Sequence, residues 1–95
     1  MSTKAEKAHY DAVARLGCIL CYKQGNEGTP AELHHIRRTM PRSVSPVIPL
    51  CSYHHRGSNT SIHGMGRKRF EREYETTEEK LLELTTALMD QSPAL

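Results

Sequence analysis

The feature that most constrains this chain of 95 residues is the spacing of its three cysteines. Cys18 and Cys21 form a Cys-x-x-Cys pair, and Cys51 with His54 forms a Cys-x-x-His pair. Three thiolates and one imidazole complete a closed tetrahedral zinc shell. An odd cysteine number does not suit a disulfide framework, and a thioredoxin-like redox pair would need a βαβ pattern, which we do not find. We therefore expect a structural Zn²⁺ site, with His55 as an alternative to His54.

Such an ion suits the composition. Only 5% of the residues are aromatic and there is no Trp, so a chain this short has little material for a core. A structural zinc ion contributes on the order of 10 kcal/mol to folding. Residues 1–17 carry charges and no apolar run, which indicates neither a signal peptide nor a membrane span. We expect a reducing, cytoplasmic location (host cytoplasm if the protein is phage-derived) and no membrane partner.

Apolar periodicity and turn residues predict a small α+β fold in a single domain. A first helix covers 3–16, with Gly17 as its stop, and 18–33 is expected to be loop. Short strands are expected at 33–36 and 47–51, a short helix at most within 52–64, and helices at 66–75 and 77–89, the last capped by Thr76. The expected parts of the domain 1–95 are an N-terminal helix (1–17), a zinc-containing core (18–75), and a C-terminal helix and tail (76–95).

Apart from the zinc ligand His54 and the isolated His9, the chain has four histidines. They are His34, His35, His55 and His63, whereas His9 lies alone on the first helix. Buried imidazoles need partners, and this chain has little core to enclose them. A divalent ion held by imidazoles keeps open positions for a phosphate and water, and a neighbouring neutral histidine can deprotonate that water. Because adjacent residues of a strand face opposite ways, His34 and His35 should have different roles, and both can serve one site only if the strand twists or ends there.

The chain resembles the HNH (ββα-metal) endonuclease superfamily at Leu33-His34-His35-Ile36 and at Ile48 to His55. The order of Cys18-Ile-Leu-Cys21, Ala31 to Ile36, Pro49-Leu50-Cys51, His54-His55 and Ser61-Ile62-His63-Gly64, followed by Phe70 and Tyr74, is similar to a narrower group. That group holds the phage recombination-enhancement, RecA-dependent nuclease. The resemblance spans about residues 18 to 74, over half of the chain, and its motifs are specific in combination.

The resemblance implies a role for each histidine. His34, His55 and His63 correspond to the ligands of a catalytic divalent ion (Mg²⁺, Mn²⁺ or Zn²⁺), and His35 corresponds to the general base. The implied fold is a ββα-metal core of two short antiparallel strands and a helix around the ion. The implied activity is hydrolysis of DNA phosphodiester bonds, in a protein of phage recombination.

Two features depart from the family pattern. HNH proteins often carry an Asn before the second strand to orient the base, whereas residues 43–47 contain none; Ser43, Ser45 or a backbone carbonyl are the available substitutes. No long basic extension precedes the first helix, so we do not expect dependence on a recombinase filament to carry over.

The net charge is only +2, but the basic residues are unevenly distributed. Between Arg37 and Arg72 the only acidic residue is Glu71. Phosphate contacts supply most of the affinity of DNA-binding proteins, and we expect them here with weak sequence preference. The candidates are Arg37, Arg38, Arg42, Arg56, Arg67, Lys68 and Arg69. A solvated basic face is the alternative.

Two other functions fit part of the pattern. A non-catalytic, zinc-stabilised nucleic-acid-binding module explains the cysteines and the basic segment. An accessory protein of a recombination or packaging machine would use the 77–89 helix as its protein contact. Both leave four histidines without a role. Metal stoichiometry separates both alternatives from the nuclease, because a nuclease should bind a second divalent ion and a structural module only zinc.

Overall fold

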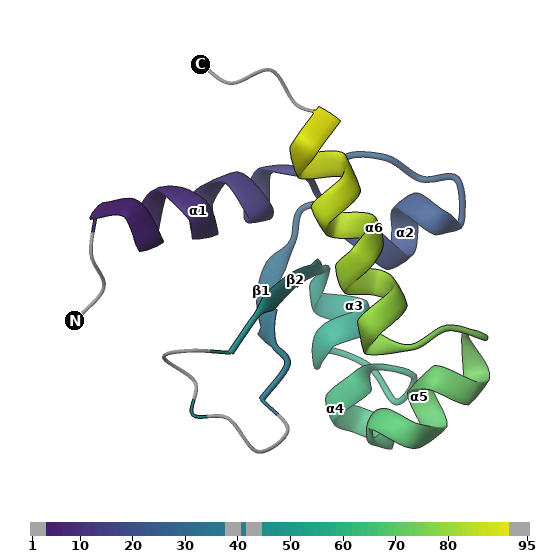
Figure 1. The fold of residues 1–95 in the computed structure, drawn as a ribbon. Helices are drawn as coiled ribbons and strands as arrows, with labels where there is room; N and C mark the ends of the chain where they lie inside the picture. Colours follow the sequence, from purple (N-terminus) through teal and green to yellow (C-terminus); the bar gives the residue numbers. More distant parts are fainter. Residues whose placement is uncertain (1–3, 38–40, 42–44, 92–95) are drawn as a thin grey trace.

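The chain folds as a small α+β protein in a computed structural model that describes residues 4–37, 41 and 45–91 (Figure 1). The elements are α1 (Lys4–Arg15), α2 (Ile19–Lys23), β1 (Glu32–His35), β2 (Val47–Leu50), α3 (Ser52–His55), α4 (Ile62–Met65), α5 (Arg67–Glu73) and α6 (Glu78–Gln91). This confirms the expected α+β class. No described helix is long and apolar enough to cross a membrane.

The two strands form an antiparallel sheet in which His34 lies opposite Ile48 and His35 opposite Val47. All of β2 is buried, whereas β1 buries His34 alone and half-buries its other residues. Because β1 ends at His35, the strict alternation of side chains also ends there. The chain then runs from β2 directly into α3, so the order of these three elements is strand, strand, helix.

Two features differ from the sequence-based expectation. Residues 18–33 are not loop throughout, because α2 lies within them. The last helix is capped by Thr77 rather than Thr76: the N–H of Lys80 donates to Thr77 Oγ1 at 3.0 Å. Glycine ends α1 as expected, since Gly17 has a φ of 80°. The predicted start of the first helix at residue 3 and the end of the tail at 92–95 lie outside the described residues.

The core lies where α6 packs against β2, α2 and α1. Phe70, Leu81 and Ile48 are fully buried there, together with the three cysteines. Leu82, Leu84 and Leu88 of α6 are partly buried against this cluster. In Figure 1, α6 runs across the molecule beside α2. The C-terminal helix therefore contacts both α2 and β2, which lie far from it in the sequence. Its apolar stripe therefore serves the protein's own core.

Candidate metal centres

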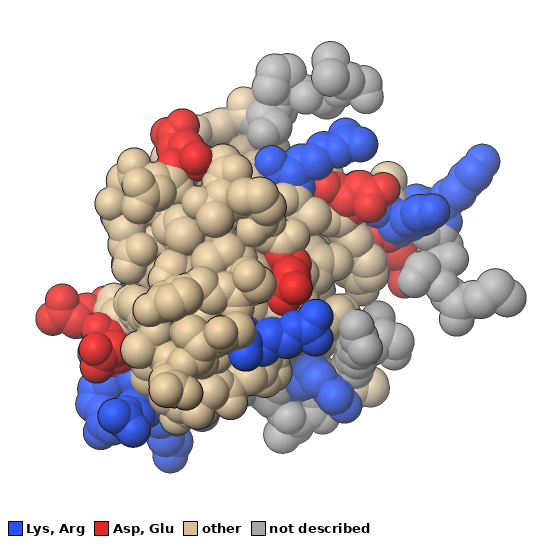
Figure 2. Space-filling view, turned by 180° about the vertical axis from the view of Figure 1, so that it is seen from behind, with Lys and Arg blue, Asp and Glu red and all other residues tan. Residues whose placement is uncertain are grey.

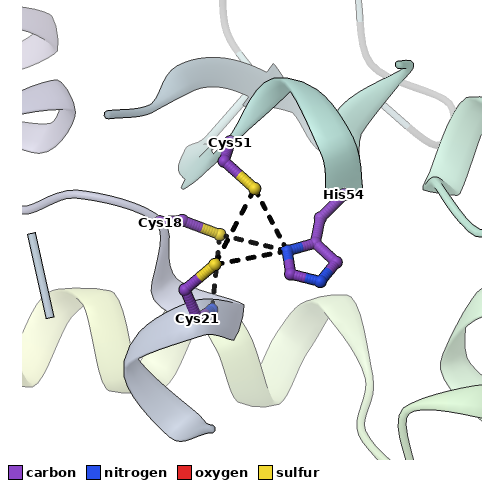
Figure 3. A group of neighbouring side chains, drawn as sticks. All are labelled: Cys18, Cys21, Cys51 and His54. Atoms are coloured by element: carbon purple, nitrogen blue, oxygen red, sulfur yellow. Dashed lines mark hydrogen bonds between the residues drawn. The ribbon is translucent and has the colours of Figure 1, made fainter. Parts of the chain in front are cut away.

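Cys18, Cys21, Cys51 and His54 converge on one point, with all four side chains buried (Figure 3). The Nδ1 atom of His54 lies 3.2 Å from the sulfur of Cys51 and 3.5 Å from each of the other two sulfurs. The sulfurs of Cys21 and Cys51 are 3.8 Å apart, too far for a disulfide. The structure thus groups His54, and not His55, with the cysteines.

These spacings match the edges of a tetrahedron around one ion. Metal–sulfur bonds of about 2.3 Å and a metal–nitrogen bond of about 2.0 Å give edges of about 3.8 Å between sulfurs and about 3.5 Å between sulfur and nitrogen. The observed separations are within a few tenths of an ångström of these values. The buried Cys₃His cluster therefore fits a closed, four-coordinate metal ion.

Two short helices set this geometry. Cys18 is the N-cap of α2 and its sulfur accepts the N–H of Cys21 at 3.4 Å, while Cys51 is the N-cap of α3. Each pair therefore places one ligand just before a helix and the other on its first turn. The ring of His54 is then held edge-on by Tyr53 and Tyr74, each with its centroid 5.3 Å away.

Burial controls the titration of this cluster. Desolvation raises the pKa of Cys18 to about 12, against smaller opposing effects of backbone hydrogen bonds. Desolvation also lowers the pKa of His54. Both shifts favour the neutral side chains when no cation is present, and an ion that binds here must displace the Cys18 proton.

A second cluster is formed by His34, His55 and His63, whose ligand atoms lie within 4.8 Å of one another. They come from β1, the end of α3 and α4 respectively. The Nε2 atoms of His55 and His63 are 3.2 Å apart. The imidazoles meet at steep angles, with the His34 ring centroid 5.3 Å from that of His55 and 5.6 Å from that of His63. Three imidazoles arranged in this way can hold one divalent ion and leave coordination positions open.

His35 lines the same pocket as this cluster. The pocket holds about 220 Å³ and is lined by Leu33, His34, His35, Arg37, His55 and His63. The two adjacent histidines share it because β1 ends at His35, as the sequence-based argument required. The Nδ1 atom of His35 lies 3.3 Å from the buried hydroxyl of Ser45, one of the substitutes named above for the missing Asn. Ser43 lies outside the described residues.

Two carboxylates contact imidazoles of the metal-binding cluster, and neither was predicted from the sequence. Glu32 accepts from Nδ1 of His55 at 2.8 Å, and Glu78 of α6 lies 2.6 Å from Nε2 of His34. The position of Glu32, two residues before His34, was a signal for the first contact, because both face the same side of β1. No sequence signal pointed to the second, since Glu78 is 44 residues from His34.

The surroundings of the histidine cluster lower the pKa of two further groups, Glu32 and His63. The hydrogen bond from His55 lowers the pKa of Glu32, with help from Arg56. Burial lowers the pKa of His63, and the neighbouring His55, His34 and Arg56 act in the same direction. A lowered pKa keeps the His63 imidazole neutral, with a lone pair available, to lower pH.

The predicted phosphate contacts fall into two sets. Arg37 is exposed at the pocket, and Lys68 and Arg69 are exposed on α5. Arg56 and Arg67 instead pair with carboxylates, at 3.4 Å from Glu32 and 3.2 Å from Glu71. On the face shown in Figure 2, Lys and Arg side chains lie among acidic ones, around a wide uncharged area. Arg38 and Arg42 lie outside the described residues.

The comparison with known families gives the class. The model of the family described as recombination enhancement, RecA-dependent nuclease matches residues 2–90. The chain therefore belongs to this family, and membership implies nuclease activity, a link to recombination and binding of nucleic acid. The match agrees with the narrower of the two resemblances seen in the sequence. No curated protein matches the chain.

Proposed function

We propose that this chain is an HNH (ββα-metal) DNA endonuclease with one catalytic divalent ion, a general-base histidine and low sequence specificity. The observation that carries the proposal is the convergence of His34, His55 and His63 in one pocket that His35 also lines. Membership in a nuclease family supports a hydrolytic role for these residues. Without such chemistry, four histidines in one pocket have no function.

The order of elements supports the HNH assignment. An antiparallel pair, β1 and β2, is followed at once by α3; β1 supplies His34 and His35, and α3 supplies His55. We place the whole chain 1–95 in one nuclease domain: the first helix (1–17), the zinc and ββα core (18–75), and the last helix with its tail (76–95).

In the proposed mechanism, a divalent ion held by the three histidines would stabilise negative charge at the scissile phosphate and the leaving oxygen. His34, His55 and His63 bind it through neutral imidazole nitrogens. We assign His35 the tautomer whose Nδ1–H donates to Ser45, because Nε2 then carries the lone pair that takes a proton from the attacking water. Arg37, at the rim of the pocket, holds a phosphate of the bound strand.

We assign Zn²⁺ to the Cys₃His cluster, as a structural ion. Three thiolates are soft ligands, and the closed tetrahedral geometry suits an ion without open positions. The histidine pocket instead takes Mg²⁺, Mn²⁺ or Zn²⁺, because imidazoles with open positions accept each of them to differing degrees. The protein should therefore bind two ions per chain.

Phosphate contacts from Arg37, Lys68 and Arg69 hold DNA in this proposal, with Arg56, Arg67, Arg38 and Arg42 as further candidates. We keep phage recombination as the setting and the host cytoplasm as the location. The family's description names dependence on RecA, so two forms of the activity are to be compared for this chain: cleavage that requires a RecA filament and cleavage that does not. Assays with and without RecA-coated DNA decide between the two.

The test is cleavage of supercoiled plasmid by zinc-loaded protein with Mg²⁺, Mn²⁺ or additional Zn²⁺, with EDTA as a control. We expect nicking by the wild type and none by His55→Ala, whereas His9→Ala, an exposed histidine of α1, should retain activity. If neither the wild type nor His9→Ala cleaves single- or double-stranded DNA with any ion, whether the DNA is bare or coated with RecA, the proposal fails. A single bound zinc would then favour the nucleic-acid-binding module.

A further inference from the structure

A buried contact between a carboxylate and an imidazole connects the C-terminal helix to the histidine pocket. Oε2 of Glu78 lies 2.6 Å from Nε2 of His34, with only 5% and 8% of the two side chains exposed. A carboxylate buried to this degree needs a partner, because the loss of hydration is otherwise uncompensated. His34 is one such partner, so the contact is part of the folded state of both residues.

The contact determines which nitrogen of His34 is free. We assign Glu78 the ionised form, which only accepts hydrogen bonds, so that Nε2 of His34 carries the proton and donates it to the carboxylate. The lone pair of Nδ1 is then available to an ion. Glu78 does not itself belong to the group of ligand atoms formed by the three histidines. Glu78 would therefore contact a ligand of the ion, His34, rather than the ion itself.

The start of α6, which carries Glu78, is fixed by contacts with α5 and by its own N-cap. The backbone N–H of Glu78 donates to Oε2 of Glu71 at 2.8 Å, and the other oxygen of Glu71 accepts from Arg67 at 3.2 Å. Thr77 caps the start of α6 through the N–H of Lys80. The end of α5 thus holds the start of α6, which in turn presents Glu78 to His34.

Glu32 makes the equivalent contact with His55. Its carboxylate accepts from Nδ1 at 2.8 Å, which leaves Nε2 of that imidazole for the ion. Two of the three histidines are therefore held from behind by carboxylates, one from β1 and one from α6. Carboxylates in this position fix the tautomer and orientation of a ligand imidazole and raise its basicity.

We propose that Glu78 is a positioning residue of the histidine metal site, so that α6 is part of the site and not only of the core. The inference rests on the proposed function, because it requires that His34 bind the ion. It predicts that removing the charge of Glu78 weakens ion binding at the histidines and leaves the Cys₃His cluster unaffected.

The test compares Glu78→Gln with Glu83→Gln, which removes the same charge from an exposed position of the same helix. Proteins that carry one zinc ion per chain are titrated with Mn²⁺ and, separately, with Ni²⁺ by calorimetry. We expect the dissociation constant of Glu78→Gln to rise about 10- to 100-fold, and that of Glu83→Gln to stay at the wild-type value. Both variants should retain one tightly bound zinc per chain.

A second measurement uses the wild type alone and does not depend on the folding of a variant. In protein with Zn²⁺ at both sites, nitrogen NMR of the His34 ring should show a proton on Nε2 and the ion on Nδ1. An ion on Nε2, or equal ion affinity in Glu78→Gln and the wild type, would overturn the role of Glu78 alone. No second ion in the wild type would overturn the proposed function as well.

Discussion

The Nε2 atoms of His55 and His63 lie 3.2 Å apart, although the two residues come from different helices. Two imidazole nitrogens at this distance repel through their lone pairs unless a proton or a cation lies between them. Metal–nitrogen bonds of about 2.0–2.1 Å place neighbouring ligands about 2.9 Å apart at a right angle and about 3.4 Å apart in a tetrahedron. The separation therefore falls within the range expected for two ligands of one ion.

The Cys₃His cluster should be required for folding. We expect Cys51→Ser to lose zinc and most of its helical circular dichroism at 25 °C, because structural zinc contributes on the order of 10 kcal/mol and the core is small. Zinc release measured with a chromogenic chelator checks the loss of the ion. Ser52→Ala, at the exposed neighbouring position, is the control. A folded, zinc-free Cys51→Ser protein would show that the ion is dispensable.

Zinc binding should release a proton from Cys18. Its raised pKa, about 12, keeps the thiol protonated at neutral pH, whereas the ion binds the thiolate. Zinc affinity should therefore increase as pH rises, and the release of this proton alone contributes about tenfold per pH unit. Calorimetry in buffers of different ionisation enthalpy measures the release. Binding with no proton release between pH 6 and 8 contradicts the assignment.

Ser45 should affect catalysis and not ion binding. Its hydroxyl is the partner of Nδ1 of His35, and a net hydrogen bond contributes about 1 kcal/mol. We therefore expect Ser45→Ala to lower kcat roughly fivefold while the affinity for the catalytic ion stays unchanged. Single-turnover cleavage and ion titration separate the two quantities. A weaker ion affinity in this variant would mean that Ser45 supports the metal ligands instead.

The exposed basic residues of α5 should contribute to DNA affinity through phosphates. We expect Lys68→Ala and Arg69→Ala each to weaken binding and to reduce the slope of log affinity against log salt by about 0.9. Lys23→Ala, an equal charge change at the end of α2, serves as the control. Fluorescence anisotropy with an unrelated DNA sequence tests the expected lack of sequence preference. If all three variants bind alike, α5 does not face the DNA.

Much of this architecture follows from local sequence signals. The α1, α5 and α6 helices carry apolar periodicity, and the spacing of Cys18, Cys21 and Cys51 indicated one shared ion. Helix α2 was missed because its five residues lie between a cysteine cap and a glycine-rich stretch, where short helices have no periodicity to detect.

The remaining features depend on contacts that local patterns do not encode. Sequence spacing left His54 and His55 as alternatives, whereas on a helix consecutive side chains point about 100° apart, and α3 turns only the first toward the cysteines. Glu78 reaches His34 through tertiary packing alone. The capping-box pattern predicted Thr76 as the cap of α6, and this prediction is wrong, because the N–H of Lys80 donates to Thr77 Oγ1 instead.

The central claim is that the histidine pocket hydrolyses DNA with His35 as the base. The most direct measurement is single-turnover cleavage of supercoiled plasmid by His35→Ala and by the wild type, both zinc-loaded, folded and saturated with Mg²⁺ or Mn²⁺. Loss of a general base should reduce the rate about 10²- to 10⁴-fold, with ion affinity unchanged. Equal rates for the two proteins would contradict the claim.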